Sequence, residues 1–475
     1  MEISSLIGHT SEILRISLKS HLPTDKIARE YLRSKKYLGS NDRRFISGLL
    51  YSFLRIKSIP DYVFDQIEKK SEFDTLLSDK KVKDVIYVLI GLLALVQLKI
   101  PLEFQMKVDS GNSSNLGRLI EELAEKTANK FQADAGILKN LLFKANKSFE
   151  NLLIQTEESS ELPLSNANLI PYAARYGVQP WIIESLISNK TYQKSELEDL
   201  LQSLFLPAPI TLRINSGADK RQELIEKLRK YDPECNETEY SPWGINLSKR
   251  IDLNTVPEYK MGLFEVQDEG SQLISVALSP NQGDSILDAC AGAGGKSLHL
   301  SSLMDNTGEI SSTDVELKKL KELNNRAKKA GFDNITTYLV KNHKKRFHDK
   351  VLVDSPCSGM GTVRRNPMLK WTLSPKKLKQ YNNKQYSILE HNSAFVKNGG
   401  VLVYATCSIL PQENEMIIEK FLENHDDFRA ESLRPAFEKF DITLPNLSSS
   451  DFQYQLLPSV HGCDGFYMAK MIRKQ

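Results

Sequence analysis

The sequence from Val351 to Gly361 reads VLVDSPCSGMG, an apolar run that ends on a carboxylate and a thiol. Three apolar residues, two of them β-branched, are typical of a buried strand in a parallel sheet. Open sheets of this class bind ligands at the carboxyl ends of their strands, where Asp354 and Cys357 lie. Residues 401–408, VLVYATCS, repeat the pattern with Cys407. The sequence therefore predicts two thiols at the ends of neighbouring strands.

The length of 475 residues suggests about three domains at roughly 150 residues each. A net charge of +3, from 63 basic and 60 acidic residues, favours no class of partner by itself. The most apolar run, residues 85–96, is shorter than the ~17–25 residues that span a bilayer. We therefore expect this run to be a buried helix, and we expect no membrane contact.

The cysteines are odd in number and widely spaced, with no CxxC pair: Cys235, Cys290, Cys357, Cys407 and Cys463. This pattern favours neither a zinc site nor a disulfide framework, and it fits a reducing compartment. The N-terminal residues show no pattern of a signal peptide. We expect a cytoplasmic protein without a metal, and the sequence sets no oligomeric state.

Residues 1–155 carry helix signals and almost no strand pattern. Thr24-Asp25 and Asn41-Asp42 are candidate N-caps, and apolar residues recur at helical spacing after them. Basic residues outnumber acidic ones in part of this region: Arg29, Arg33, Lys35, Lys36, Arg43, Arg44, Arg55 and Lys57. They form either the solvated surface of a helical bundle or a face that contacts phosphates.

Residues 156–262 alternate helical and strand-like pieces, which predicts a small α+β module. The run ITLRIN, residues 210–215, alternates with period two and is typical of a strand. An amphipathic helix follows, with Leu224, Ile225 and Leu228 on one side. The alternation places Arg213 on the solvent face, where it is a candidate for a phosphate contact.

Residues 285–297, SILDACAGAGGKS, join a strand to a helix through a glycine-rich turn. Glycine permits positive φ and a close approach of ligand to backbone. The turn matches neither the dinucleotide pattern nor a P-loop, because Cys290 lies where a P-loop has its first glycine. The next strand, residues 309–313, ends at Asp314. This carboxylate is a candidate for binding ribose hydroxyls, and capping the following helix is a compatible second role.

Further runs predict strands at residues 334–340, 350–354 and 400–406. Residues 452–457 and 466–472 predict a closing antiparallel hairpin. Strands that alternate with helices and end in such a hairpin are typical of the class I methyltransferase sheet, a Rossmann-like α/β fold.

Four motifs resemble those of the RsmB/Sun family of S-adenosylmethionine-dependent RNA cytosine-5 methyltransferases: LDACAGAGGK (287–296), DSPCSG (354–359), ATCS (405–408) and DGFYMA (464–469). Residues 31–46, YLRSKKYLGSNDRRFI, resemble the NusB-type RNA-binding helical domain that precedes certain bacterial RNA methyltransferases. The resemblance implies three domains: an all-α NusB-like domain over 1–155, an RNA-binding-like α+β adaptor over 156–262, and a catalytic α/β domain over 263–475. It points to the ribosomal RNA branch of the family, with small-subunit RNA as the substrate.

The resemblance also implies a role for each motif. Cys407 is the nucleophile that adds to cytosine C6, and Cys357 assists its release; covalent catalysis of this kind splits one hard step into easier ones. Asp354, by its place at the end of the neighbouring strand, is a candidate to hydrogen-bond the N3/N4 edge of the cytosine while protonated, and the resemblance also places it by the cofactor. The residues implied to bind S-adenosylmethionine are Cys290, Ala291, Gly292, Ala293, Gly294, Gly295, Lys296, Asp314 and Asp354. A free cysteine is usually only a small buried hydrophobe, but two in matching motifs favour catalysis.

The chain departs from the family pattern at two places. Gly292-Ala293 stand where the family commonly has Ala-Pro, a change that keeps the turn small. Lys341 and Asn342 stand where the family usually has Gly-Asp, and Asn342 is the candidate replacement for that carboxylate beside the adenine.

The target base must leave its stack to reach such a pocket. Basic residues near the catalytic motifs are candidates for holding the surrounding RNA by its phosphates. They are Lys341, Lys344, Lys345, Arg346, Arg364 and Arg365, with Lys370-Trp371 also placed near the substrate.

Three other functions fit parts of the sequence. DNA cytosine-5 methylation also uses a Pro-Cys motif, but there that cysteine is the nucleophile and Cys407 has no role. Transfer RNA is an alternative RNA substrate. A non-catalytic NusB-like RNA-binding factor is the third, and the missing acidic residue near Lys341 supports it.

Overall fold

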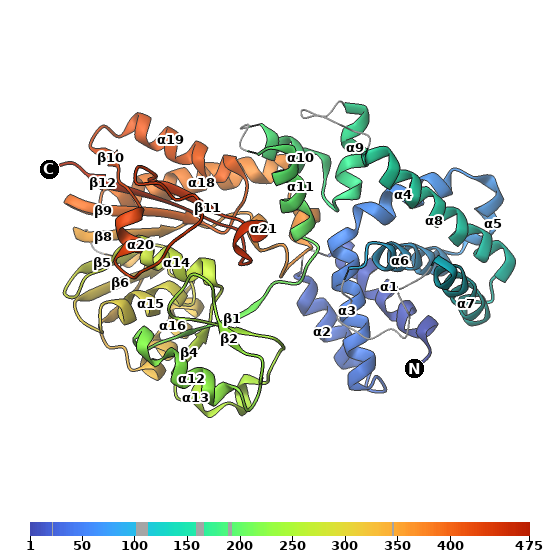
Figure 1. The fold of residues 1–475 in the computed structure, drawn as a ribbon, viewed down its shortest axis with the longest axis horizontal. Helices are drawn as coiled ribbons and strands as arrows, with labels where there is room; N and C mark the ends of the chain where they lie inside the picture. Colours follow the sequence, from blue (N-terminus) through green and yellow to red (C-terminus); the bar gives the residue numbers. More distant parts are fainter. Residues whose placement is uncertain (21, 101–112, 158–165, 189–191, 344–345) are drawn as a thin grey trace. The chain divides into compact units, whose positions relative to one another are not determined.

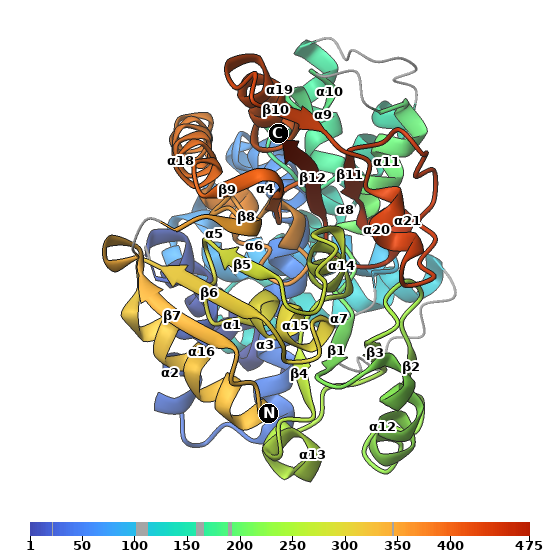
Figure 2. The same cartoon turned by 90° about the vertical axis from the view of Figure 1, so that its left-hand side faces the viewer.

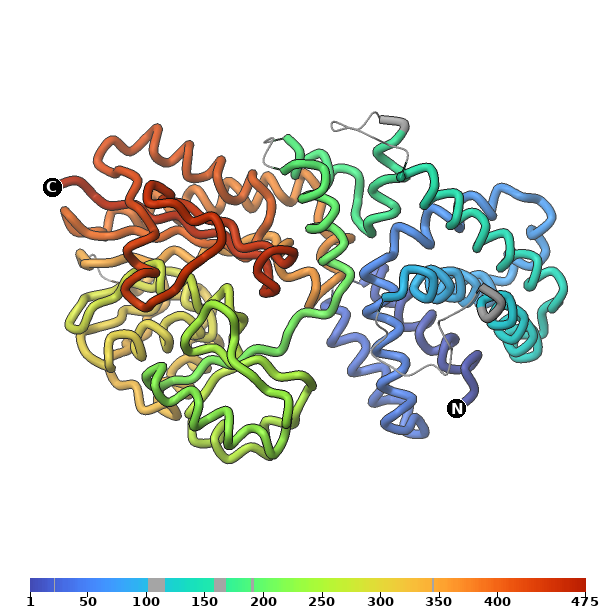
Figure 3. The backbone as a smooth tube through the Cα atoms, in the orientation of Figure 1, coloured from blue at the N-terminus to red at the C-terminus, as the bar shows by residue number. Residues whose placement is uncertain are grey.

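The chain forms two units in the computed structural model, one built of helices and one built on two β-sheets (Figure 1, Figure 3). The first comprises Met1–Pro207 and Val363–Thr372, and the second comprises Ala208–Thr362 and Leu373–Gln475. The structure describes residues 1–20, 22–100, 113–157, 166–188, 192–343 and 346–475. Lys344 and Lys345, two of the predicted RNA contacts, lie outside the described residues.

The helical unit is organised around α6 (Lys80–Gln97), which contains the apolar run predicted to be a buried helix. Asp79 caps α6 by accepting hydrogen bonds from the backbone N–H groups of Lys81 and Val82. Its apolar side chains are buried in a core shared with the neighbouring helices, which confirms the prediction.

None of the described helices is long and apolar enough to cross a membrane. The other α-helices described in this unit are α1 (Ile3–Lys19), α2 (Thr24–Ser34), α3 (Ser40–Ile56), α4 (Ser58–Glu68), α5 (Asp74–Ser78), α7 (Ser113–Phe131), α8 (Ala135–Glu157), α9 (Asn166–Arg175), α10 (Pro180–Ile187), α11 (Lys194–Ser203) and α17 (Leu369–Thr372).

Residues 363–372 belong to the helical unit although they follow the first cysteine motif in the sequence. A helix leaves its last carbonyl groups without partners inside the helix, and α3 ends beside this segment. Trp371 Nε1 donates to the Leu54 carbonyl at 2.7 Å, and Lys370 Nζ donates to the Arg55 carbonyl at 2.7 Å. The segment therefore completes the end of α3.

Two predicted RNA contacts in this segment are wrong. Lys370 is fully buried, and its amine also donates to the Gly177 carbonyl at 2.6 Å. Arg364 is buried as well and donates to the Pro207 carbonyl at 2.9 Å. Both basic side chains donate to main-chain carbonyls of the helical unit, so neither is available to a phosphate.

The second unit begins with a small antiparallel sheet in the strand order β2-β3-β1-β4. Its strands are β1 (Ile210–Ile214), β2 (Asn236–Glu237), β3 (Gly244–Leu247) and β4 (Phe264–Val266), accompanied by α12 (Arg221–Leu228) and α13 (Pro257–Lys260). Leu212 and Ile214 of β1 pack with Leu224 of α12 in one apolar core. The prediction that Arg213 faces solvent is wrong, because the opposite face of β1 is covered by the glycine-rich turn at Gly295.

The large sheet has the strand order β10-β12-β9-β8-β5-β6-β7, and β11 pairs with β12. Its strands are β5 (Ser285–Asp288), β6 (Glu309–Asp314), β7 (Ile335–Leu339), β8 (His348–Asp354), β9 (Val396–Thr406), β10 (Phe428–Ala430), β11 (Gln453–Leu456) and β12 (Phe466–Arg473). Strands β5 to β9 are parallel, whereas β12 is antiparallel to β9, β10 and β11. The antiparallel pairing of β11 with β12 confirms the predicted hairpin.

Helices pack on both faces of the large sheet (Figure 2). Ile286 and Leu352 point to one face and pack with Leu273, whereas Leu287 and Val351 point to the other face and pack with Leu389. This alternation explains why the strands read as continuous apolar runs, because both faces are buried. The covering helices are α14 (Glu269–Ala277), α15 (Gly295–Leu303), α16 (Leu317–Ala330), α18 (Pro375–Ser393) and α19 (Glu415–Asn424), and two short helices follow, α20 (Arg434–Glu438) and α21 (Pro458–His461).

Candidate active site

The two cysteines of the predicted site lie at the ends of adjacent parallel strands. Asp354 of β8 pairs with Ala405 of β9, so the loops that follow both strands leave the same edge of the sheet. Cys357 Sγ and Cys407 Sγ are 3.3 Å apart. The hydrogen bond to Cys407, together with burial, raises the pKa of Cys357 well above its usual range. Cys357 is therefore held as the neutral thiol, within hydrogen-bond distance of the other sulfur.

One buried carboxylate, which the sequence did not single out, connects the two cysteine loops. Glu413 Oε1 accepts from Ser358 N at 2.8 Å and from Gln385 Nε2 at 3.0 Å. Glu413 Oε2 accepts from Ser408 Oγ at 2.5 Å and also from Ser358 Oγ. A serine follows each of the two cysteines, so this repeated Cys-Ser pair was the available sequence signal for a shared acceptor.

Asn414 supports the second cysteine loop from the same short segment. Its Oδ1 accepts from Thr406 Oγ1 at 2.6 Å, and its Nδ2 donates to the Ser408 carbonyl at 3.0 Å. The residues on either side of Cys407 are thus both fixed by hydrogen bonds. Preorganisation of this kind lets a nucleophile attack without reordering its loop.

The C-terminal DGF motif closes on the first cysteine loop through two glycines. Gly361 N donates to the Cys407 carbonyl at 2.9 Å, and Gly465 N donates to the Gly361 carbonyl at 2.9 Å. A Cβ atom at Gly361 would overlap the Gly465 carbonyl. Glycine is required there because three backbone segments meet without room for a side chain.

The glycine-rich turn between β5 and α15 has the conformation that its composition predicts. Gly292 has φ +57° and Gly294 has φ +91°, both in the left-handed region. A Cβ atom at Gly294 would contact Leu323, whereas nothing lies within 4 Å of the corresponding point at Gly292. The backbone is therefore open to a ligand at Gly292 and closely packed against α16 at Gly294.

Three strands end in carboxylates next to this turn. Asp314 Oδ2 accepts from Gly292 N at 3.0 Å, and its Oδ1 accepts from Glu316 N at 2.7 Å, so it fixes both the turn and the start of the next helix. Asp288 is fully buried and accepts from Ser297 Oγ at 2.6 Å; burial raises its pKa to about 6. The third is Asp354, discussed next.

Lys296 connects the turn to the end of β8. Its ammonium donates to Asp354 Oδ2 at 2.6 Å. Burial lowers the pKa of Lys296, but the attraction and hydrogen bond of Asp354 outweigh burial and leave the pKa raised. A charged lysine and a carboxylate are thus fixed between the turn and the cysteine pair.

The remaining residues predicted from the sequence are described by their burial and by their own contacts. Cys290 lies in the turn, where burial raises the pKa of its thiol and favours the neutral form. Lys341 and Asn342 are exposed and form a short 3-10 helix after β7. Arg346 forms an ion pair with Glu309 at 2.5 Å.

The turn fits the S-adenosylmethionine expected from the sequence resemblance. Backbone open to a ligand at Gly292 is followed by the free N–H groups of the first turn of α15, which attract a carboxylate. Asp314 supplies an oxygen pair at the end of the neighbouring strand. Within the described ranges, no group of three or more His, Cys, Asp and Glu residues is arranged to hold a metal ion.

Comparison with known proteins gives two family matches. Residues 275–472 match the model described as 16S rRNA methyltransferase RsmB/F. Residues 180–254 match the model of the ferredoxin-like domain of RsmF/B-like methyltransferases.

Individual relatives agree with these models. The probable ribosomal RNA small subunit methyltransferase B of Bacillus subtilis is 30% identical over 340 residues, which cover 70% of this chain and 75% of that protein. A 28S rRNA (cytosine-C(5))-methyltransferase of Mus musculus is 30% identical over 320 residues, 63% of this chain and 39% of that protein. The crystal structure of a methyltransferase homologue from Pyrococcus horikoshii is 26% identical with a TM-score of 0.54, and the match covers 65% of this chain and all of that one.

Proposed function

The chain belongs to the RsmB/F family of 16S rRNA methyltransferases and uses S-adenosylmethionine to methylate C5 of cytosine in ribosomal RNA; we propose that the target lies in small-subunit RNA and that Cys407 forms a covalent adduct with it. The observation that supports this mechanism is the pair of thiols 3.3 Å apart at the ends of β8 and β9. A single thiol would suffice for packing, whereas a pair suits a nucleophile and a second thiol that assists its release.

Cys407 acts first. Its thiolate adds to C6 of the cytosine, forming an S–C6 bond, and the C5=C6 electron pair becomes available at C5 as N3 gains a proton. A free thiol is only a few per cent ionised at neutral pH, so the thiolate needs a stabilising donor. Cys357, held as the thiol at hydrogen-bond distance, supplies that donor.

Asp354 and Lys296 position the base. Asp354 lies at the end of β8, next to the cysteine loop, and meets the N3/N4 edge of the flipped cytosine. Its ion pair with Lys296 fixes the carboxylate and keeps a proton donor beside the site where N3 gains its proton. This arrangement stabilises the charge that attack at C6 creates.

The glycine-rich turn holds the methyl donor. When bound, S-adenosylmethionine supplies an electrophilic methyl group to C5. Residues 290–296 would line its binding turn, Asp314 would accept hydrogen bonds from the ribose hydroxyls, and Asn342 would lie beside the adenine.

Release restores the aromatic ring. A base removes the C5 proton, the C5–H electron pair reforms C5=C6, the S–C6 bond breaks to return the Cys407 thiolate, and N3 gives back the proton that it gained during the attack. Cys357 assists because its S–H group donates to the departing sulfur.

The helical unit is proposed to bind RNA as a NusB-like domain over residues 1–155, ahead of an adaptor (156–262) and the catalytic domain (263–475). Arg29, Arg33, Lys36 and Arg44 are exposed on α2, α3 and the turn between them, and they suit phosphate contacts. Arg55 is buried and donates to the Arg364 carbonyl, so it is not part of this surface. A cytoplasmic location is part of the proposal.

A denaturing gel tests the covalent mechanism. Cys357→Ala incubated with small-subunit ribosomal RNA and S-adenosylmethionine is expected to give a slowly migrating protein–RNA band, because release is impaired. The band should be absent when Cys407→Ala is added. Cys235→Ala is the matched control, since Cys235 is buried beside α12 of the small-sheet module and donates to the Ile225 carbonyl, and it should give no band and normal methylation.

The outcomes separate the parts of the proposal. No band from Cys357→Ala, with active wild type, contradicts the release role of Cys357. A band with transfer RNA but not with ribosomal RNA contradicts the assignment of ribosomal RNA as the substrate. Wild type that methylates neither RNA would place the non-catalytic RNA-binding function first.

A further inference from the structure

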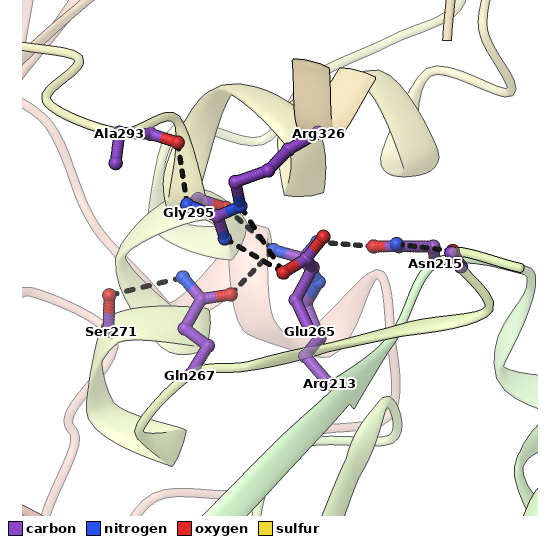
Figure 4. Close-up of polar contacts among 9 residues, drawn as sticks. Arg213, Asn215, Glu265, Gln267, Ser271, Ala293, Gly295 and Arg326 are labelled. Atoms are coloured by element: carbon purple, nitrogen blue, oxygen red, sulfur yellow. Dashed lines mark hydrogen bonds and ion pairs between the residues drawn. The ribbon is translucent and has the colours of Figure 1, made fainter. Parts of the chain in front are cut away.

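Two arginines from different elements donate hydrogen bonds to backbone carbonyls of the glycine-rich turn (Figure 4). Arg213, on β1 of the small sheet, donates from Nη1 to the Gly295 carbonyl at 2.6 Å. Arg326, on α16, donates from Nη1 to the Ala293 carbonyl at 2.5 Å. The two carbonyl groups belong to the turn that fits S-adenosylmethionine, so both guanidinium groups fix the backbone of the cofactor site.

Polar side chains hold the two guanidinium groups in place. Glu265 lies opposite Arg213 in the pairing of β4 with β1, and its Oε2 accepts from Arg326 Nε at 3.2 Å and Nη2 at 3.0 Å. Arg213 also donates to Gln267 Oε1 and to Asn215 Oδ1, each at 2.5 Å. Because the planar guanidinium group presents its donors in a fixed geometry, these acceptors orient it toward the turn.

Burying the guanidinium group of Arg213 costs free energy, which indicates that its hydrogen bond to the turn has a function. Arg213 is fully buried, and desolvation lowers its pKa to about 9. A buried cation is unfavourable unless hydrogen bonds replace the lost water. An apolar residue on that strand would pack at lower cost, but it would leave the Gly295 carbonyl without this donor.

The turn needs external support because it is rich in glycine. Gly292 and Gly294 permit the left-handed backbone but also leave the free chain many alternatives. Across a planar trans peptide, a carbonyl and the next N–H point in opposite directions. Anchoring the Gly295 carbonyl to Arg213 therefore turns the Lys296 N–H toward the other side of the turn.

We propose that Arg213 and Arg326 are positioning residues that hold the glycine-rich turn in the conformation that binds S-adenosylmethionine. The small sheet is thereby a structural part of the cofactor site through β1 and β4. The identity of the ligand rests on the proposed function, whereas the holding of the turn rests on the hydrogen bonds alone.

Calorimetry with S-adenosylmethionine and S-adenosylhomocysteine tests the proposal on Arg326→Gln, Arg326→Lys and Arg213→Lys. Arg326 is the safer site because its side chain is 22% exposed. Each variant is expected to bind both molecules about tenfold more weakly, the scale of one lost charge-assisted hydrogen bond. KM for S-adenosylmethionine should rise with little change in kcat, and the Kd for RNA should stay within twofold.

Arg221→Lys is the matched control in the same unit. Arg221 also donates to a main-chain carbonyl, that of Ser241 at 3.0 Å, but it does not contact the turn. Its cofactor affinity should equal that of wild type.

Hydrogen exchange of the cofactor-free protein provides the second measurement. Peptides covering residues 288–298 should exchange faster in the Arg326 variants than in wild type and Arg221→Lys, while other peptides of the unit keep their protection. Unchanged affinity and unchanged exchange would overturn the proposal, and so would a loss of protection throughout the unit. If wild type itself fails to bind S-adenosylmethionine, the proposed function fails, and the exchange data still decide whether the arginines hold the turn.

Discussion

Replacing Glu413 should disconnect the two cysteine loops without touching either thiol. The Glu413 carboxylate accepts four hydrogen bonds, two from Ser358, one from Ser408 and one from Gln385. Glu413→Ala removes both acceptor oxygens, and with them all four hydrogen bonds, from a fully buried site. We expect methylation to be lost while the binding of S-adenosylmethionine is retained, because the glycine-rich turn is formed by other residues.

The size of the effect follows from the unpaired donors. Each buried donor left without a partner costs about 1–3 kcal/mol, so the alanine variant loses on the order of 4 kcal/mol or more. That is a large part of the roughly 5–15 kcal/mol that stabilises a typical protein, so we expect the two loops to lose their order locally. A shift of about 1 Å at a catalytic group costs roughly a hundredfold in rate, so kcat should fall at least that far.

Glu413→Gln should be much milder. The amide oxygen keeps two of the acceptor contacts, and the hydroxyls of Ser358 and Ser408 rotate to accept from the new NH₂ group. We expect kcat within about tenfold of wild type. Recovery by glutamine but not by alanine is the signature of a positioning role, because the charge itself is then dispensable.

Single-turnover transfer of a labelled methyl group to ribosomal RNA measures the effect. The same substitutions in the Cys357→Ala background report the rate of adduct formation separately. Glu415→Ala is the matched control, since no described contact joins Glu415 to either serine, and it should leave both rates unchanged. Wild-type single-turnover rates in Glu413→Ala would refute the reasoning.

Three shorter predictions concern other parts of the molecule. Burial and repulsion from Arg55 lower the pKa of Lys370 to about 7, so between about pH 7 and 10 the unfolded chain binds a proton that the folded chain does not. Urea unfolding of wild type should therefore show stability rising with pH in that window, and Lys370→Met should lose this dependence. Gly361→Ala places a Cβ on the Gly465 carbonyl and should lower the free energy of unfolding by about 1–3 kcal/mol and abolish methylation, measured by thermal unfolding and activity. Lys296→Met leaves Asp354 without its ion-pair partner and removes the proton donor proposed for N3, so the single-turnover methylation rate should fall about a hundredfold, the lower end of what a general acid contributes.

The catalytic unit was predictable from the sequence because its signals are local. A parallel strand buried on both faces reads as an apolar run, and the residue that ends it lies at the sheet edge by geometry alone. Asp314, Asp354, Cys357 and Cys407 could therefore be assigned to one edge before the structure was considered. The glycines of the turn were predictable as well, since the positive φ values of Gly292 and Gly294 are ones that glycine adopts readily.

The errors concern cations whose partners lie far along the chain. Period-two alternation in β1 correctly separates Arg213 from Leu212 and Ile214, but it cannot say whether the second face meets water or another part of the chain. Likewise, Lys370 reads as a surface charge until the carbonyl groups at the end of α3 are seen to accept from it. The sequence alone does not show whether a lysine or arginine will bind a phosphate of the RNA or a backbone carbonyl of the protein.

The same limit applies to residues that the sequence did not single out at all. Arg326 and Glu413 are ordinary in their local sequence, and each becomes important because a loop without regular hydrogen bonding needs a fixed partner. The cysteine loops and the glycine-rich turn are loops of this kind, placed at a strand edge where ligands bind. A scan of activity by substitution should therefore find sensitive positions in two classes: motif residues that touch cytosine or cofactor, and buried polar residues elsewhere in the chain that satisfy the backbone of the motifs. The second class separates from the first by rescue, because a residue that only supplies a hydrogen bond tolerates an isosteric replacement, whereas Cys407 as the proposed nucleophile does not.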